Sequence, residues 1–269
     1  MNIKLLEFKN QNNEILRGIL TLPDGEIRSG VIFVHGFERN ATVEKKFRLT
    51  ANELAKQGIA SLRFDASGCG LSEGDFSDTT IAKRSQEMMA AVDFFKNEVG
   101  DIKIDLFAHS LGACLVAARL EELKPIASKI VLVAPALNQR DLLRFYFARD
   151  LMKIKDPGIA VSWNNYKQYL DEELFQKNCD QANAMLKENF IGSNYFMEAK
   201  SVDFSRSFDG IKEKVLHIHG DADPKVPLES LGSIFPNRII VPGGDHDLER
   251  PDWWCQWFSK AAEFITGGN

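Results

Sequence analysis

Residues 103–120 read KIDLFAHSLGACLVAARL and combine two patterns that meet at one serine. The first part, residues 104–108, is a short apolar run of the kind that forms a buried strand. From Leu111 onward, leucine and alanine recur at helical spacing. A strand that runs directly into a helix needs a very tight turn, and Ser110 occupies that turn. The stretch therefore predicts a serine hydroxyl pushed clear of a sheet edge, beside the unpaired N–H groups of a helix start.

Two interpretations of Ser110 are open from this stretch alone. In the first, Ser110 is an exposed nucleophile, and Gly112 lets the helix start pass close to the strand. In the second, Ser110 is only a helix N-cap, a position that serine favours in any protein. The motif reads A-x-S-x-G, because Ala108 stands where the usual nucleophile motif has glycine. The rest of the chain has to distinguish the two.

Short apolar runs and helical spacing alternate along most of the chain. Strands are expected at residues 3–8, 14–22, 30–34, 59–64, 129–133, 214–219 and 237–241, and helices at 43–57, 79–99, 228–235 and 251–265. The first two strands flank a polar turn and predict a hairpin at the sheet edge. The remaining alternation predicts the α/β class, with a mainly parallel sheet covered by helices on both faces.

Residues 137–200 interrupt this alternation with a segment rich in both aromatic and charged residues. We interpret the segment as a mostly helical insert. The expected organisation is a core formed by residues 1–136 and 201–269, with a cap insert at 137–200. Ten aromatic side chains of the insert have two interpretations: they pack the insert onto the body, or some of them line an apolar substrate pocket.

Composition excludes several classes of protein. The chain has 269 residues, 44% of them hydrophobic and 26% charged, which suits one large globular domain. A net charge of −5 argues against a nucleic-acid partner, since phosphate binding needs a basic face. The four cysteines are scattered without zinc spacing, and we expect neither a metal nor a cofactor. No leader and no membrane-spanning run is recognisable, so a cytoplasmic protein with reduced thiols is expected.

Candidate catalytic side chains follow the expected strands. Ser110, Asp221, Asp223 and His246 each lie just past the end of a strand, in the order serine, aspartate, histidine. The carboxyl ends of parallel strands meet at one edge of a sheet, where ligands bind. Imidazole is able to accept a serine proton near neutral pH, and a carboxylate fixes its tautomer. This placement favours nucleophilic catalysis over the N-cap interpretation.

At these motifs the chain resembles the α/β-hydrolase superfamily, over nearly everything except the insert. The matching parts are HGF at 35–37, DASGCGLSEG at 65–74, AHSLGA at 108–113, GDADPKVP at 220–227 and GGDH at 243–246. Within the superfamily it looks most like small intracellular serine esterases and lipases of the cinnamoyl-esterase and monoacylglycerol-lipase kind. Those proteins carry a helical cap at the place of residues 137–200.

The resemblance implies a role for each matching position. Ser110 is the expected nucleophile and His246 the expected base, while Asp223 matches the acid position and Asp221 is its rival. The backbone N–H groups of Phe37 and Leu111 are the expected oxyanion hole.

Two further histidines, His217 and His219, alternate on one expected strand and so share a face. They are either two metal ligands or structural residues. The sequence has no third ligand at useful spacing, which favours structural roles.

The expected activity is hydrolysis of a small-molecule carboxylic ester, with a short-to-medium acyl or aromatic group, through an acyl-enzyme. Aminopeptidase, thioesterase and perhydrolase activities use the same triad and remain alternatives. A non-catalytic ligand-binding homologue is a further alternative, because fold alone does not decide function.

Overall fold

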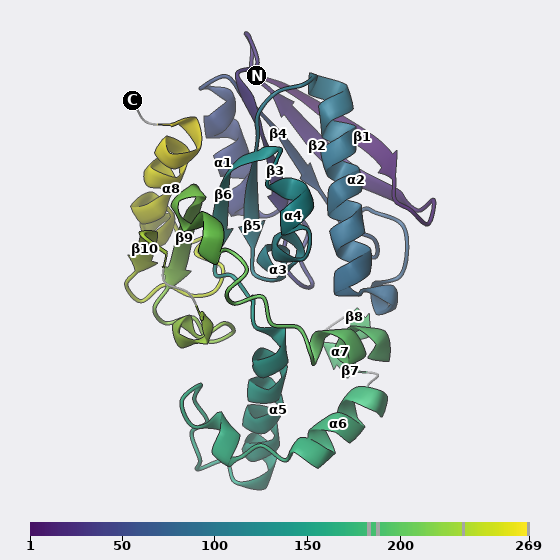
Figure 1. Ribbon diagram of the computed structural model, residues 1–269, viewed down its shortest axis with the longest axis vertical. Helices are drawn as coiled ribbons and strands as arrows, with labels where there is room; N and C mark the ends of the chain where they lie inside the picture. Colours follow the sequence, from purple (N-terminus) through teal and green to yellow (C-terminus); the bar gives the residue numbers. More distant parts are fainter. Residues whose placement is uncertain (182–183, 187–188, 233–234, 268–269) are drawn as a thin grey trace.

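An eight-stranded sheet forms the centre of the protein in a computed structural model that describes residues 1–181, 184–186, 189–232 and 235–267 (Figure 1). Its strands are β1 (Asn2–Lys9), β2 (Ile15–Leu22), β3 (Ser29–Val34), β4 (Ile59–Phe64), β5 (Ile104–His109), β6 (Ala127–Val133), β9 (Val215–Gly220) and β10 (Asn237–Val241). They lie in the order β1-β2-β4-β3-β5-β6-β9-β10. β1 and β2 form an antiparallel hairpin at the edge, β2 pairs antiparallel with β4, and all other neighbours are parallel. The predicted fold class is confirmed.

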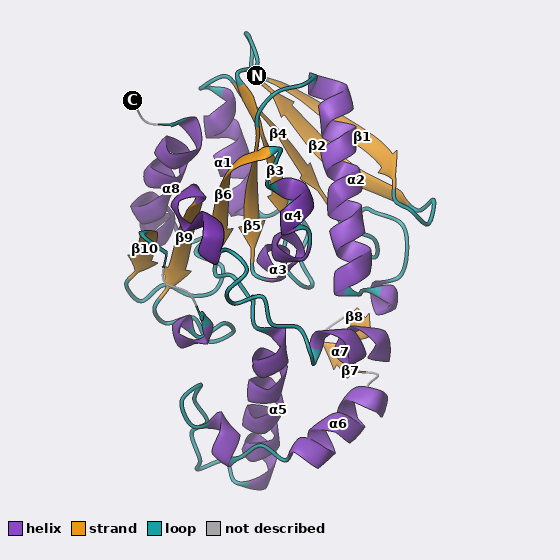
Figure 2. Ribbon diagram, in the orientation of Figure 1, coloured by secondary structure: helices purple, strands orange, loops and turns teal. Residues whose placement is uncertain are grey.

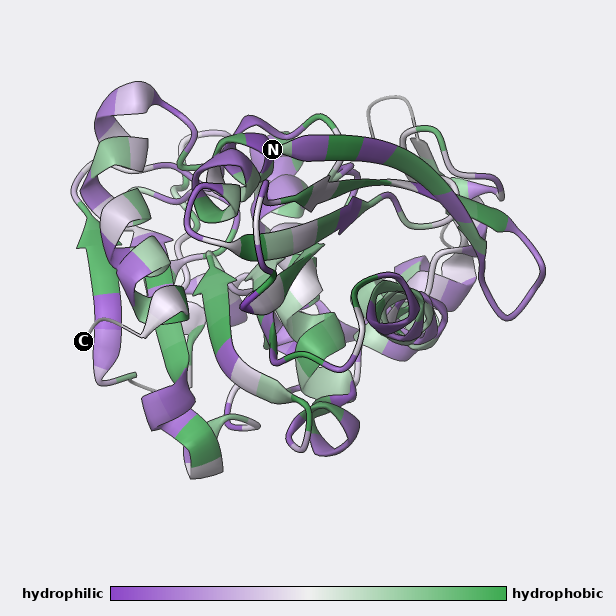
Figure 3. Cartoon of the chain, turned by 90° about the horizontal axis from the view of Figure 1, so that it is seen from above, coloured by the Kyte–Doolittle hydropathy of each residue, from purple (hydrophilic) through white to green (hydrophobic). Residues whose placement is uncertain are grey.

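Helices cover both faces of the sheet (Figure 2). One face carries α1 (Lys45–Ala55) and α8 (Pro251–Thr266), and the other carries α2 (Ile81–Val99), α3 (Leu111–Ala118) and α4 (Leu120–Leu123). Alternation along β3 shows how one strand serves both layers: Ile32 and Val34 face the α2 side, while Val31 and Phe33 face the α1 side. All four are buried, which explains why the strand is a continuous apolar run. Figure 3 shows the hydrophobic character of the central strands.

The helix predicted for residues 228–235 is wrong. Only one 3₁₀ turn, η4 (Leu228–Ser230), forms there, and residues 233–234 lie outside the described part of the chain. Leu231 is already extended and packs against the core. Gly232 follows so close to Ser205 that an added Cβ would lie 2.7 Å from the Ser205 hydroxyl. The apolar spacing of this stretch therefore reflects an extended chain pressed onto the core.

Residues 137–200 contain helices and one small hairpin. The elements are α5 (Gln139–Lys155), η2 (Tyr166–Gln168), α6 (Glu172–Gln181), β7 (Ala184–Leu186), β8 (Asn189–Ile191) and α7 (Ser193–Ala199). In Figure 1, α5 and α6 lie beyond the carboxyl edge of the sheet. By contrast, α7 packs on the body, where Glu198 accepts hydrogen bonds from the N–H groups of Ile81 and Ala82 at 2.6 and 2.9 Å. The division into core and insert at residues 137 and 200 stays a prediction.

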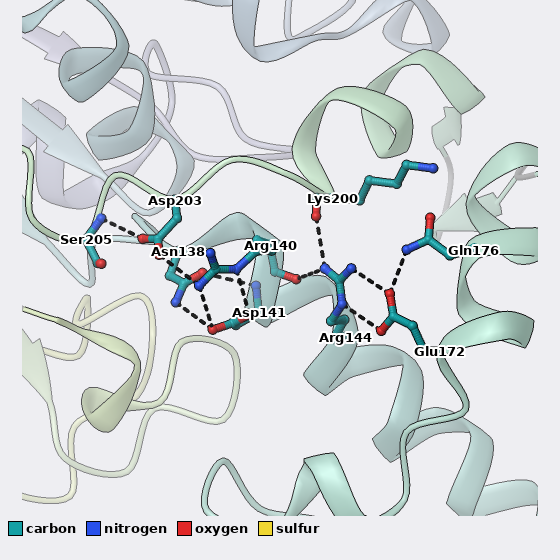
Figure 4. A network of polar contacts seen from close by, with 9 residues as sticks. All are labelled: Asn138, Arg140, Asp141, Arg144, Glu172, Gln176, Lys200, Asp203 and Ser205. Atoms are coloured by element: carbon teal, nitrogen blue, oxygen red, sulfur yellow. Dashed lines mark hydrogen bonds and ion pairs between the residues drawn. The ribbon is translucent and has the colours of Figure 1, made fainter.

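A polar network fastens the start of α5 to the chain that returns to the sheet (Figure 4). Arg140 Nη2 donates to Asp203 Oδ2 at 2.9 Å, and Arg144 Nη1 donates to the Lys200 carbonyl at 2.9 Å. Arg144 also forms a two-pronged ion pair with Glu172 of α6. The network thereby holds the beginning and the end of the 137–200 insert together above the sheet edge.

Two 3₁₀ turns complete the chain, η1 (Phe76–Asp78) before α2 and η3 (Asp209–Lys214) before β9. Among the described residues, no helix combines the length and the apolar character needed to cross a bilayer.

Candidate active site

Ser110 occupies the sharp turn between β5 and α3 with backbone angles φ 54° and ψ −118°. Positive φ is costly for a residue that carries a Cβ, and such strain persists only where the surrounding structure imposes it. The Ser110 side chain forms no capping hydrogen bond with the helix that it precedes. Its hydroxyl is therefore not used as an N-cap, which removes the simpler of the two interpretations of this serine.

Close packing explains the small residues around this turn. A Cβ at Gly112 would lie 2.3 Å from the Val34 carbonyl oxygen, so only glycine lets α3 start against the end of β3. A Cβ at Gly36 would lie 3.0 Å from the Cβ of Ser110. Ala108 is fully buried in β5, where it is paired with Val34. The loop after β3 is thus pressed against the serine.

Asp223 and His246 meet at the same edge, although they follow different strands. His246 Nδ1 lies 2.8 Å from Asp223 Oδ2. The other carboxylate oxygen, Oδ1, accepts from the N–H groups of Lys225 and Val226 at 2.8 and 2.9 Å. Burial alone would raise the pKa of the Asp223 carboxyl, but hydrogen bonds from His219 and His246 outweigh it and hold that pKa well below its ordinary value. Asp223 is therefore an ionised, fully hydrogen-bonded carboxylate.

His109 connects this pair to the serine turn. Its Nε2 donates to the backbone carbonyl of His246 at 3.0 Å, and the two imidazole rings are 4.8 Å apart. Burial holds the pKa of His109 well below its ordinary value, so this imidazole is neutral. Because His109 is the residue before Ser110, the contact brings the loop of His246 to the turn that carries the serine.

The loop after β3 is fixed by His35. Its Nδ1 donates to the Gly36 carbonyl at 2.8 Å, and its Nε2 accepts from the N–H of Ala66 at 3.0 Å. Burial lowers the pKa of His35 to about 3, which keeps the ring neutral with one donor and one acceptor. Phe37, the expected oxyanion donor, follows directly in this loop.

Arg84, which was not among the predicted site residues, supports the same loop. This arginine of α2 is 1% exposed. Its Nη2 donates to Cys69 Sγ at 2.8 Å, and its guanidinium lies 5.8 Å from the centre of the Phe37 ring. Its spacing from Ile81 and Met88 places Arg84 on the buried face of α2 and was the available signal, although arginine is rarely fully buried.

Charged side chains join the Phe37 loop to the loop of His246. Lys46 Nζ lies 2.8 Å from Glu44 Oε2 and 3.4 Å from Glu249 Oε1. Arg39 pairs with Asp247, the residue after His246. Since Lys46 is almost fully buried, its ion pairs are screened little by solvent.

Asp221, the rival acid, lies apart from this constellation. It is exposed, and its Oδ1 accepts from the N–H of Gly243 at 2.6 Å. The structure thus places Ser110, Asp223 and His246 at one sheet edge, with Phe37 and Leu111 at the neighbouring strand ends and Asp221 outside.

Residues 25–230 match the family described as serine aminopeptidase, S33. The chain belongs to this family of α/β-hydrolases. Among solved structures, the esterase Est1E from Butyrivibrio proteoclasticus with ferulic acid bound is similar, with a TM-score of 0.74, 22% identity and coverage of 97% of this chain and 98% of that chain. An esterase from Pyrococcus furiosus has a TM-score of 0.67 and 20% identity, covering 99% of this chain and 90% of that chain. At these identities the likeness shows the fold. None of the curated proteins matches the chain in sequence.

Most aromatic side chains of the insert in this α/β-hydrolase pack against one another. Phe145, Tyr146, Trp163 and Tyr166 form one cluster of rings, and Phe147 packs edge-on against Phe175. Tyr195 is different, because it stacks on the Phe37 ring with centroids 4.6 Å apart. Much of the aromatic content therefore builds the insert itself, while Tyr195 reaches the loop beside the serine.

Helix α5 of the α/β-hydrolase also contacts the loop that carries Asp223. The Tyr146 hydroxyl donates to the carbonyl of Lys225, and Arg149 Nη1 donates to the carbonyl of Pro224 at 3.1 Å.

The described residues contain no group of three histidine, cysteine, aspartate or glutamate side chains that could hold a metal.

Proposed function

We propose that this α/β-hydrolase is a serine esterase that cleaves carboxylic esters with short-to-medium acyl or aromatic acyl groups. The observation that carries the proposal is the buried Asp223–His246 pair, whose loop is hydrogen-bonded to His109, the residue before Ser110 on its positive-φ turn. Strain of this kind is typical of functional sites. A serine hydroxyl needs a base to become nucleophilic, and in this proposal the base is His246, which is hydrogen-bonded to Asp223.

In the proposed reaction, Ser110 Oγ attacks the ester carbonyl carbon while His246 Nε2 takes the serine proton. Asp223 accepts from Nδ1 of His246, which keeps Nε2 free to accept and stabilises the imidazolium. Collapse of the tetrahedral intermediate breaks the ester bond, and His246 returns the proton to the leaving alcohol. Water then attacks the acyl-enzyme by the same route and releases the acid.

The negative oxygen of each tetrahedral intermediate needs donors that are already in place. We propose the backbone N–H groups of Phe37 and Leu111, at the ends of the neighbouring strands β3 and β5. His35 and Arg84 hold the Phe37 loop, so the first donor does not need to reorganise during the reaction. Loss of one such donor typically costs about 10²–10³ in kcat.

An aromatic acyl group is supported by two observations. Phe37 and Tyr195 form a stacked pair beside the serine loop, and aromatic substrates pack well on such rings. Ferulic acid, the molecule named with the Butyrivibrio structure, is an aromatic acid.

A cytoplasmic location belongs to the same proposal, supported by four free thiols of which three are buried. Recovery of the native protein from a membrane or extracellular fraction would contradict that location.

Aminopeptidase activity is the second candidate, because the matched family is described by it. One experiment separates the two. Purified protein is treated with a serine-directed fluorophosphonate and assayed on p-nitrophenyl butyrate and on an aminoacyl p-nitroanilide. The proposal expects labelling at Ser110 and ester cleavage that the probe abolishes. Faster cleavage of the anilide would establish the aminopeptidase instead, and a protein that neither labels nor cleaves would be a non-catalytic homologue.

A further inference from the structure

Strand β9 carries a line of buried imidazoles that ends on the Asp223 carboxylate. His217 Nε2 lies 3.1 Å from His219 Nδ1. His219 Nε2 in turn lies 2.8 Å from the carbonyl oxygen of Val226 and 3.3 Å from Asp223 Oδ2. His217 and His219 are 3% and 0% exposed, so neither ring contacts bulk water. The line therefore runs from the interior of the sheet to the residue that faces His246.

The chemistry of the partners fixes the protons along this line. A carbonyl and a carboxylate only accept hydrogen bonds, so His219 Nε2 must carry a hydrogen. Burial lowers the pKa of His217 to about 3, and a neutral His217 is able to donate from Nε2 to a bare Nδ1 of His219. Each ring then donates in the same direction, toward Asp223.

Asp223 Oδ2 consequently faces two imidazole N–H groups: Nδ1 of His246 at 2.8 Å, and Nε2 of His219 at 3.3 Å, whose hydrogen is shared with the closer Val226 carbonyl. A carboxylate oxygen that accepts a second hydrogen bond is a weaker acceptor for the first. The His219 donor also bridges Asp223 to the Val226 carbonyl, which closes the turn that orients the carboxylate.

We propose that His219 is a positioning residue of the active site, which fixes the orientation of Asp223 and limits the basicity that Asp223 confers on His246. The inference rests on the proposed function, in which Asp223 and His246 act on Ser110. Loss of the His219 donor concentrates the carboxylate charge on His246 and stabilises its imidazolium. The decrease of kcat/KM at low pH, which reports protonation of the catalytic base, should then occur at higher pH.

Other ionisable groups also surround the Asp223–His246 pair. They come from every element packed against it: His109 of β5, Tyr146 of α5, Lys46 of α1, and Arg39, Lys225 and Asp247 of the loops. All of them are retained in every variant below. A difference between variants therefore reports the loss of His219 and its contacts, and the His217→Leu control accounts for the contact with His217.

The test compares three buried substitutions on one strand. His219→Leu removes the donor, while His219→Gln keeps an amide donor near the position of Nε2. His217→Leu is the matched control, because it removes a buried imidazole and its hydrogen bond from the same strand without touching Asp223. Each variant is checked for folding by its melting temperature and circular dichroism. If His219→Leu does not fold, His219→Asn takes its place, since the shorter amide does not reach Asp223.

The measured quantities are kcat/KM for p-nitrophenyl butyrate against pH, and the titration of His246 by NMR. For His219→Leu we expect a loss of about tenfold to a hundredfold in kcat, since misplaced catalytic groups are costly. The acidic limb of its pH profile, which is the decrease of kcat/KM at low pH, should move to higher pH by about half a pH unit or more. His219→Gln should recover most of both, and His217→Leu should keep the limb of the unmodified protein.

Three results would overturn the proposal: an unchanged limb in His219→Leu, equal losses in the leucine and glutamine variants, or the same shift in His217→Leu. Failure of the proposed function is recognised separately. In that case the unmodified protein cleaves no ester, and the NMR titration of His246 still decides whether His219 acts on the pair.

Discussion

Asp221 and Asp223 lie two residues apart after the same strand, yet they have opposite surroundings. Asp223 is 8% exposed and accepts from His246, whereas Asp221 is exposed and accepts from the N–H of Gly243. The difference arises because the chain turns at Asp221 and Ala222, where the Asp223 N–H donates to the Gly220 carbonyl, so Asp221 faces solvent and Asp223 faces the interior. Their positions in the sequence do not show which of the two aspartates contacts His246, whereas the geometry of the turn does.

Exchange of each aspartate for asparagine should therefore have unequal effects. Asp223→Asn should lower kcat by about 10³–10⁴, because the amide favours the wrong imidazole tautomer. Asp221→Asn should change kcat by less than about twofold, since surface substitutions away from the site act weakly and asparagine still accepts from Gly243. The measurement is kcat on p-nitrophenyl butyrate for both purified variants. Similar losses in both would contradict the assignment of Asp223 as the acid.

Ser110 offers a prediction that joins activity to stability. Ser110→Ala and Ser110→Gly should both abolish ester cleavage, because each removes the nucleophile. Glycine tolerates the positive φ of this turn and alanine does not. We therefore expect Ser110→Gly to be more stable than Ser110→Ala by about 1 kcal/mol in urea unfolding. Residual kcat above a few per cent in either variant would exclude Ser110 as the nucleophile, and equal stabilities would contradict the strain.

The predictable part of the molecule is the part with a local pattern. The buried run before Ser110, the helical spacing after it and the glycine at 112 each have a one-dimensional signature, and the structure has a strand, a turn and a helix there. His217 and His219 also had a pattern, since alternation placed them on one face. What they contact depends on how the turn at Asp223 folds back toward β9, which the alternation along the strand does not specify.

The parts that sequence did not predict depend on tertiary contacts. Arg84 is buried because the loops of Phe37 and Cys69 close over it. Leu231 has helical spacing from Leu228, but its extended backbone is dictated by packing on the core. The apolar pattern of one stretch does not specify which other part of the chain that stretch packs against.

Asp105 provides a test of stability against pH that is independent of catalysis. This residue of β5 is 2% exposed and accepts from the N–H of Lys129 at 2.8 Å. Burial raises its pKa to about 6, although the Lys129 hydrogen bond opposes the shift. An aspartate has a pKa of about 3.9 in the unfolded chain. Because the folded value is higher, ionisation of Asp105 destabilises the fold as pH rises from about 4 to 6, and the cost is complete above that range.

Asp105→Asn removes this ionisation and keeps an acceptor for Lys129. Relative to the unmodified protein, the variant should gain about 2–3 kcal/mol in free energy of unfolding between pH 4 and pH 7, from about 1.4 kcal/mol per pKa unit. Urea unfolding at the two pH values measures the difference. Asp24→Asn is the control, because Asp24 is exposed. A difference independent of pH would show that Asp105 titrates normally in the folded protein.

Substrate choice tests the surface between the insert and the serine loop. Tyr195 stacks on Phe37, and Leu142 of α5 packs with Val226 near the acid loop, so apolar side chains border the site from both directions. Each buried methylene contributes roughly 0.8 kcal/mol, or about fourfold in kcat/KM. The rate should therefore rise from acetyl to butyryl and octanoyl p-nitrophenyl esters and fall at palmitoyl, with cinnamoyl esters also preferred over acetyl. A maximum at acetyl would exclude an apolar acyl site. A maximum at palmitoyl would indicate a long-chain lipase, and faster cleavage of an aminoacyl amide would favour the aminopeptidase activity.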